Sequence, residues 1–156
     1  MNSLNKRNGQ RTFATASLFA LATLCLATLA LATPALAGRT AIEKANVQVV
    51  DDFMAAWSDP DAAVVFLAPQ ASVRMVEDQP PVVGQKAIAD AFKSFMTPGV
   101  TLKVETLKTT VHGPVVMNKR VDTMKTAGKP DQVFPVIGVF VVKNGKITEW
   151  TDYLDK

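Results

Sequence analysis

The chain has 156 residues, with 17 basic and 14 acidic side chains and a formal net charge of +3. This length suits one domain with a single hydrophobic core. One cysteine excludes an internal disulfide and a cysteine-rich metal site. The lone histidine, His112, stands beside Gly113-Pro114 at an expected turn, so a histidine metal site and a triad with histidine have no support.

The first 37 residues have the three parts of a secretory signal. Three basic residues occur within the first 11 positions, residues 13–32 are nearly all Ala, Leu, Thr and Phe, and Ala35 and Ala37 fit the A-x-A cleavage pattern. We therefore expect a signal peptide over 1–37 and an exported protein, periplasmic or secreted. A permanent membrane anchor is the alternative, because the apolar run approaches the length that spans a bilayer.

Cleavage after Ala37 would change the balance of the remaining chain. It leaves 119 of the 156 residues, with 14 of the 17 basic side chains and all 14 acidic ones. This balance argues against nucleic acid as a partner. Cys25 would also be lost, which excludes a thiol nucleophile in the mature domain.

The first half of the domain is expected to be mainly helical. Thr40 and Glu43 have the spacing of a capping box, and apolar residues then recur at helical intervals. Asp59 can cap a second helix that begins with Pro60. The expected segments are helices over 41–57, 60–67 and from Gly84 to the turn at Thr97, with a strand over 71–77.

The second half is rich in β-branched and aromatic residues and reads as a series of strands. Asn144-Gly145 is the strongest hairpin signal in the chain. Early helices followed by an antiparallel meander indicate an α+β fold, in which a curved sheet closed by helices leaves an apolar pocket. The expected strands are 100–111, 115–125, 132–142 and 146–154.

Two of these strands carry charged residues that alternate with apolar ones. Arg120 and Asp122 share one face of the strand 115–125, and Asp152 alternates with apolar residues in 146–154. If both faces turn inward, two carboxylates and one guanidinium enter an apolar pocket, where they must pair because desolvating an ion is costly. Two adjacent carboxylates tend to share one proton, which suits acid/base chemistry. An ion pair that only orders the sheet is the alternative.

The chain contains an Arg-x-Asp motif, Arg120-Val121-Asp122. About 30 residues later it contains a Trp-x-Asp-Tyr motif, Trp150-Thr151-Asp152-Tyr153. This arrangement resembles the limonene-1,2-epoxide hydrolase family, which belongs to the NTF2-like (SnoaL-like) superfamily. Residues 50–57 and 80–84 resemble that family's first helix and the turn before its third helix, so the resemblance spans nearly all of 41–155. It implies an α+β cone, with a curved mixed or antiparallel sheet and about three N-terminal helices around an apolar pocket.

The resemblance also implies a role for each charged residue. Asp152 would be the general base that deprotonates a water, Asp122 the general acid that protonates the epoxide oxygen, and Arg120 the bridge between them. No metal and no organic cofactor are implied. The implied partners are a small apolar substrate and, as is common in the superfamily, a second copy that associates through the sheet.

The sequence departs from the family at the residues that hold the attacking water. The family uses a Tyr and an Asn two residues apart, where this chain has Val73 and Met75, and neither side chain makes a useful hydrogen bond. The residues expected to line the substrate pocket are Val73, Met75, Met124, Phe140, Trp150 and Leu154.

Three functions follow from these patterns. The first is the opening of a small apolar epoxide by water. The second is proton transfer of the isomerase or cyclase kind, which needs an acid and a base but no held water. The third is non-catalytic binding of a hydrophobic small molecule, with Arg120, Asp122 and Asp152 as a buried structural network.

Overall fold

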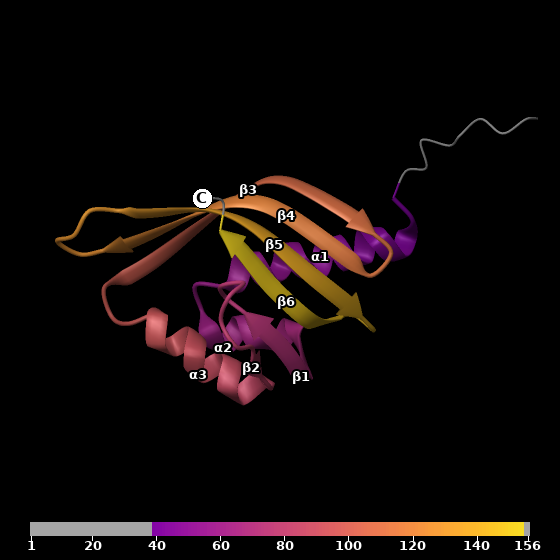
Figure 1. Cartoon of the computed structure of the whole chain (residues 1–156), viewed down its shortest axis with the longest axis horizontal. Coiled ribbons are helices and arrows are strands. Elements are labelled where there is room, and N and C mark those ends of the chain that lie inside the picture. Colours follow the sequence, from indigo (N-terminus) through magenta and orange to yellow (C-terminus); the bar gives the residue numbers. More distant parts are fainter. Residues whose placement is uncertain (1–38, 155–156) are drawn as a thin grey trace, which may run out of the picture. The chain divides into compact units, whose positions relative to one another are not determined.

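A curved six-stranded sheet packed against helices makes up the part of the chain that the computed structural model describes, residues 39–154 (Figure 1). The expected signal segment over 1–37 lies outside the described residues. No helix within 39–154 is long and apolar enough to cross a bilayer. The elements are α1 (Ala41–Ala56), α2 (Pro60–Ala63), the 3-10 helix η1 (Val64–Phe66), β1 (Leu67–Arg74), β2 (Val82–Val83), α3 (Gln85–Phe95), β3 (Val100–His112), β4 (Val115–Thr126), β5 (Gln132–Lys143) and β6 (Lys146–Leu154).

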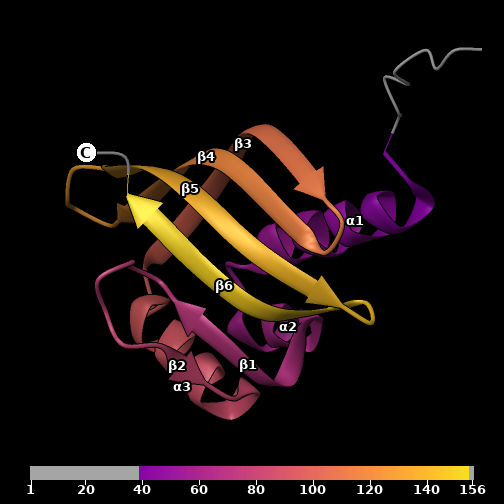
Figure 2. The same ribbon diagram turned by 45° about the vertical axis from the view of Figure 1, so that its right-hand side comes forward.

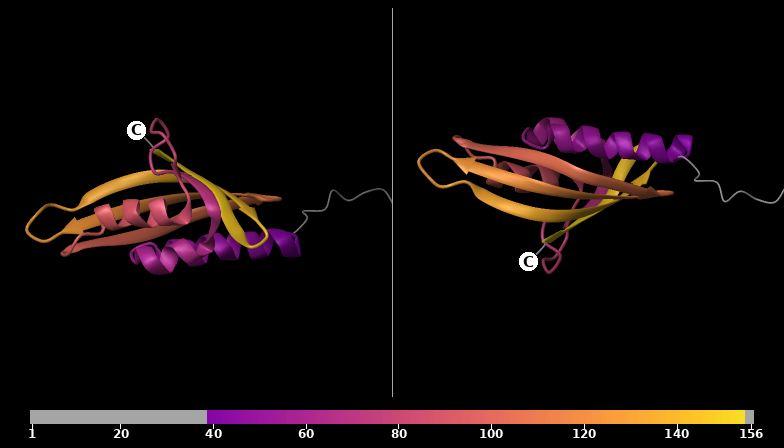
Figure 3. Two further views of the ribbon diagram at one scale, coloured as in Figure 1. Left: turned by 90° about the horizontal axis from the view of Figure 1, so that it is seen from below. Right: turned by 90° about the horizontal axis from the view of Figure 1, so that it is seen from above.

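Helix α1 begins at the predicted capping box. The Glu43 N–H donates to Thr40 Oγ1 at 3.1 Å, and the Thr40 N–H donates to Glu43 Oε2 at 2.8 Å. Glu43 Oε1 also accepts the backbone N–H of Gly113 at 2.9 Å, and Asn46 donates to the Gly113 carbonyl at 2.9 Å. These bonds fix the start of α1 to the β3–β4 turn, so the helix runs along one face of the sheet (Figure 3).

The strands are ordered β2-β1-β6-β5-β4-β3 (Figure 2). Strands β3 to β6 form the predicted antiparallel meander, and β1 joins parallel to β6, so the sheet is mixed. Asn144 and Gly145 both have positive φ, 52° and 71°, which is the geometry of a tight two-residue hairpin turn. The α+β class, the meander and this turn are confirmed.

The boundary between the second helix and the first strand was predicted wrongly. The segment 60–67 divides into α2 and η1, and Leu67 is already extended because it pairs with Ile147 of β6. The strand expected over 71–77 therefore starts earlier and ends at Arg74. Strand β2 was not predicted, because a strand of two residues carries no alternation.

An aromatic cluster fills the core between α1, α3 and the inner face of the sheet. Phe53 of α1 and Phe92 of α3 meet Phe140 of β5 and Trp150 of β6. Trp150 stacks on Phe140 with ring centroids 5.7 Å apart, and its contact with Phe53 is T-shaped with centroids 5.3 Å apart. Such pairs contribute roughly 0.5–1.5 kcal/mol each beyond their burial. The cluster therefore packs α1 and α3 against β5 and β6 next to the charged residues.

Candidate active site

Arg120 and Asp122 of β4 and Asp152 of β6 face inward, as the alternation of the two strands indicated. On β4, Asn118 and Arg120 are fully buried and Asp122 is 4% exposed, whereas the residues between them lie on the outer face. On β6, Asp152 is 3% exposed. The inner face of the sheet therefore carries a buried polar cluster of Asn118, Arg120, Asp122 and Asp152.

Arg120 joins the two carboxylates. Its Nε donates to both oxygens of Asp122 at 3.1 Å, and its Nη2 donates to Asp152 Oδ2 at 2.5 Å. Its Nη1 donates to Asn118 Oδ1 at 2.9 Å, and Asn118 Nδ2 has no partner among the described residues. All three guanidinium nitrogens are thus used, which fixes the positions of both carboxylates relative to each other.

Two tryptophans complete the surroundings of the cluster. Trp150 Nε1 donates to Asp152 Oδ1 at 2.6 Å, so both oxygens of that carboxylate accept a hydrogen bond. The Trp57 ring lies over the guanidinium, 5.4 Å from Arg120 Cζ. A cation over an indole face is stabilised by the negative face of the ring.

Gly138 leaves the space that the guanidinium occupies. It lies in β5, opposite Asn118 on β4 and opposite Asp152 on β6, directly between the two strands that carry the charges. A Cβ at this position would lie 2.3 Å from Arg120 Nη1 and 2.7 Å from Asn118 Oδ1. A side chain at position 138 would therefore displace the guanidinium from its path across β5 to Asp152.

Burial sets the protonation of the pair. It raises the pKa of Asp152 to about 6, although the Arg120 guanidinium and the Trp150 N–H favour the ionised form. Burial also raises the pKa of Asp122, again opposed by Arg120. Because burial disfavours the charged form, and because the neighbouring carboxylate adds to this effect, Asp152 takes up a proton as the pH falls toward about 6.

Replacing Trp150 by Phe should raise the pKa of the pair further. The variant keeps an aromatic ring against Phe140 but removes the Nε1–H that stabilises the Asp152 carboxylate. An ¹³C NMR titration of the aspartate carboxyl carbons would measure the change. Trp57→Phe is the matched control, because Trp57 contacts the guanidinium and not Asp152. An Asp152 titration that does not move in Trp150→Phe would contradict this assignment.

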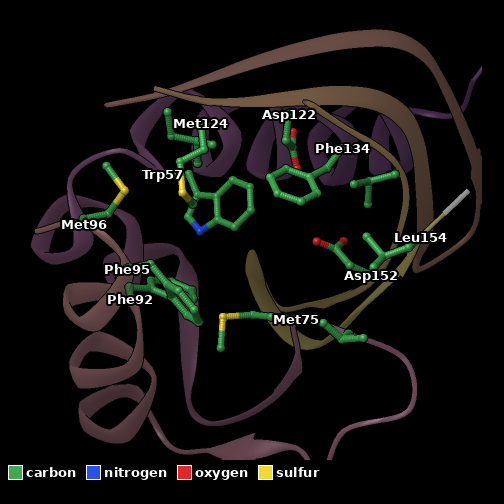
Figure 4. Close-up of a pocket in the computed structure, with 13 residues that line it drawn as sticks. Trp57, Met75, Phe92, Phe95, Met96, Asp122, Met124, Phe134, Asp152 and Leu154 are labelled. Carbon is green, nitrogen blue, oxygen red and sulfur yellow. The ribbon is translucent and has the colours of Figure 1, made fainter. Parts of the chain in front are cut away.

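A cavity of ≈ 250 Å³ opens beside the two carboxylates, where β1, β4 and β6 end and β3 and β5 begin (Figure 4). Asp122 and Asp152 are the only charged residues among the described residues that line it. The other lining residues are apolar: Trp57, Met75, Val76, Phe92, Phe95, Met96, Leu102, Met124, Phe134, Val136 and Leu154.

Of the six residues expected to line the substrate pocket, Met75, Met124 and Leu154 line this cavity, and the other three do not. Val73, Phe140 and Trp150 are fully or almost fully buried in the hydrophobic core. All six face inward, but only those toward one end of the sheet meet the cavity. The others lie nearer the middle of the sheet, where α1 and α3 cover them.

Several residues of the site were not predicted as such. Phe92 and Phe95 belong to the apolar stripe of α3, and Met96 directly follows the helix. Helical periodicity predicts an apolar face without showing which part of it meets a cavity. Gly138 leaves space for the Arg120 guanidinium. Asn118 accepts a hydrogen bond from Arg120. The only sequence signals for these two are a glycine and a polar residue inside apolar strands.

The charged residues of the cluster are paired with one another. Within residues 39–154, no group of three or more His, Cys, Asp or Glu side chains is placed to coordinate a metal. Both carboxylates already accept hydrogen bonds from Arg120. What the arrangement offers chemically is a pair of carboxyl groups at an apolar cavity, able to hold and transfer a proton.

The fold and this polar cluster define an NTF2-like, ketosteroid-isomerase-like α+β domain. The sequence matches the limonene-1,2-epoxide hydrolase catalytic domain over residues 44–156, and the chain belongs to that family. A search of curated protein sequences found no match.

Solved structures agree with this assignment. An epoxide hydrolase of M. tuberculosis described as similar to limonene-1,2-epoxide hydrolase is 25% identical, with a TM-score of 0.65 over 72% of this chain and 84% of that one. A protein of Jannaschia sp. CCS1 described as a SnoaL-like polyketide cyclase is 22% identical, with a TM-score of 0.64 over 76% and 90%. A protein of Catenulispora acidiphila with a ketosteroid isomerase-like fold is 19% identical, with a TM-score of 0.60 over 68% and 84%. The last two show the shared fold.

Proposed function

We propose that this domain opens a small apolar epoxide with water and releases a vicinal diol. The observation that carries the proposal is the placement of Asp122 and Asp152 side by side on the wall of an apolar cavity, bridged by Arg120. Membership in the limonene-1,2-epoxide hydrolase family supports it. The experiment that tests it is the incubation of purified protein with a panel of small apolar epoxides, with chiral chromatography of the products.

The proposed reaction uses one proton on the carboxyl pair. Asp122 donates it to the epoxide oxygen as the ring C–O bond breaks, while Asp152 accepts a proton from the water that forms the new C–O bond. The diol then leaves, and transfer of the proton from Asp152 back to Asp122 restores the pair. Arg120 contacts both carboxylates and keeps them in position through the cycle.

A second function, proton transfer of the isomerase or cyclase kind, is favoured by one feature of the cavity. Met75 lines it and Val73 is buried in the core, so neither holds a water where the family has a Tyr and an Asn. Among the described lining residues, only the two carboxylates and the indole of Trp57 carry polar atoms. Isomerisation of an apolar ketone needs an acid and a base but no held water, and its product would be an isomer.

Replacing Met75 by Asn should increase hydrolysis if the attacking water is poorly held. Position 75 already faces the cavity, and an amide there can donate to or accept from a water near Asp152. We expect kcat for diol formation to rise by about tenfold, since a mispositioned nucleophile can lower rates by orders of magnitude. Met75→Leu is the matched control and should show no rise. An unchanged kcat in Met75→Asn would show that water positioning does not limit the reaction.

Two further features concern the whole protein. We propose that the N-terminal segment directs export with cleavage after Ala37, and that two copies associate through the outer face of the sheet. Ile137 and Tyr153, paired on β5 and β6, are 39% and 45% exposed there, and Met117 of β4, opposite Val139, is 41% exposed. Native mass spectrometry of exported protein should give a dimer whose subunits begin at Gly38. A monomer would contradict the proposed dimer. A subunit that keeps residues 1–37 would contradict the proposed cleavage.

A further inference from the structure

The cavity presents negative charge to its occupant and no positive charge. Asp122 and Asp152 line it, whereas Arg120 is fully buried behind them and is not among the lining residues. One guanidinium therefore balances only one of the two carboxylates. With both ionised, the cluster holds one negative charge without a partner, which is costly in an apolar environment.

The other residues that line the cavity suit a ligand that carries a positive charge on a hydrocarbon group. Trp57, Phe92, Phe95 and Phe134 surround the same space as the carboxylates (Figure 4). Aromatic faces attract cations, and the Trp57 ring already lies over the guanidinium carbon of Arg120 at 5.4 Å. The methionine side chains add polarizable, adaptable surface for hydrocarbon groups.

We propose that this cavity binds a small apolar amine in its ammonium form. The hydrocarbon part packs against the aromatic and methionine side chains, and the ammonium group donates to the free lone pairs of Asp122 and Asp152. A neutral occupant leaves the second carboxylate without a counter-charge in an apolar environment. An ammonium group supplies the missing charge itself and lets both carboxylates stay ionised.

This inference rests on the same cavity as the proposed function but requires no turnover. An alkyl ammonium group has a pKa of about 10, like that of lysine, so it is charged at neutral pH. A compact amine with a six-membered ring suits a cavity of ≈ 250 Å³, which is smaller than the roughly 300–1,000 Å³ typical of sites for drug-sized ligands.

The test compares two isosteric probes, cyclohexylmethylamine and cyclohexylmethanol, by isothermal titration calorimetry with the wild-type domain. They share the same ring and differ only in the ammonium or hydroxyl group. We expect the amine to bind at least about tenfold more tightly at neutral pH. Equal affinity of the two probes, or tighter binding of the alcohol, would overturn the proposal.

Substitutions then locate the charge preference. In Asp122→Asn and in Asp152→Asn the preference for the amine should fall to about threefold or less, while the affinity for the alcohol is retained. Asp90→Asn, on the exposed face of α3, is the control and should keep the wild-type preference. A preference that survives in both pocket variants would show that the amine binds elsewhere and would overturn the proposal.

The outcomes separate this inference from the proposed hydrolysis. Diol formation by a protein that binds the amine no better than the alcohol refutes only the amine site. A clear amine preference in a protein that opens no epoxide supports the amine site and refutes only the hydrolase proposal.

Discussion

Asp152→Asn and Asp122→Asn should each abolish diol formation while leaving a folded domain. Each variant removes one partner of the acid/base pair, and such groups typically contribute about 10²- to 10⁴-fold to a rate. We therefore expect kcat/KM for an apolar epoxide to fall by at least about 10²-fold in either variant. Steady-state kinetics on the diol product would measure the loss.

The domain should remain folded in these variants because the cluster contains two carboxylates and only one guanidinium. Arg120 is bonded to two carboxylates, so one Asp→Asn change still leaves it a charged partner. Asn keeps the shape of Asp and a carbonyl oxygen that can accept from the guanidinium. Thermal unfolding monitored by circular dichroism should show little loss of stability. Arg120→Met is the contrasting variant and should unfold more readily, because it leaves two buried carboxylates without a cation.

The exposed Asp90 gives a matched control. It pairs with Lys86 at the surface of α3, away from the cavity, so Asp90→Asn should retain wild-type kinetics. Diol formation at the wild-type rate in folded Asp152→Asn or folded Asp122→Asn would contradict the assigned roles.

Gly138→Ala is the second substitution with a large expected effect. The added Cβ would lie 2.3 Å from Arg120 Nη1, so the guanidinium must move away from β5. Its bond from Nη2 to Asp152 would then be lost or lengthened, and the two carboxylates would no longer be held together. Small misplacements of catalytic groups cost about 10²-fold in rate, and we expect a loss of that order in kcat/KM.

A structural role of Gly138 would affect stability alone, so the test needs a second readout. Loss of the guanidinium from Asp152 removes a group that favours its ionised form, so the pKa of this carboxyl should rise above its value of about 6 in the wild type. An ¹³C NMR titration of the aspartates would detect the shift. Val139→Ala, the next residue on the same strand, is the control and should leave the titration unchanged. Wild-type kinetics together with an unmoved titration in Gly138→Ala would contradict the role of Gly138.

The sequence was most informative where a local rule determines the structure. The Thr40 capping box marks the start of α1, and Asn144-Gly145 marks the β5–β6 turn. The alternation along β4 and β6 shows that Arg120, Asp122 and Asp152 share a face with apolar residues, and the burial of that face makes it the inner one.

Features that depend on contacts distant in the sequence were not predicted. Val73, Phe140 and Trp150 follow the same alternation as Leu154, yet α1 and α3 cover them, so they lie in the core. Leu67 is a strand residue only because it pairs with β6. The importance of Gly138 arises from the path of a side chain on the neighbouring strand.

The most direct test of the proposed hydrolysis is a single turnover in H₂¹⁸O, with enzyme in excess over a small apolar epoxide and mass spectrometry of the product. Direct attack by a water that Asp152 deprotonates predicts a vicinal diol with one ¹⁸O atom per molecule, and no ¹⁸O in Asp122 or Asp152. An isomer of the epoxide without the label, or unchanged epoxide across the panel, would contradict the account.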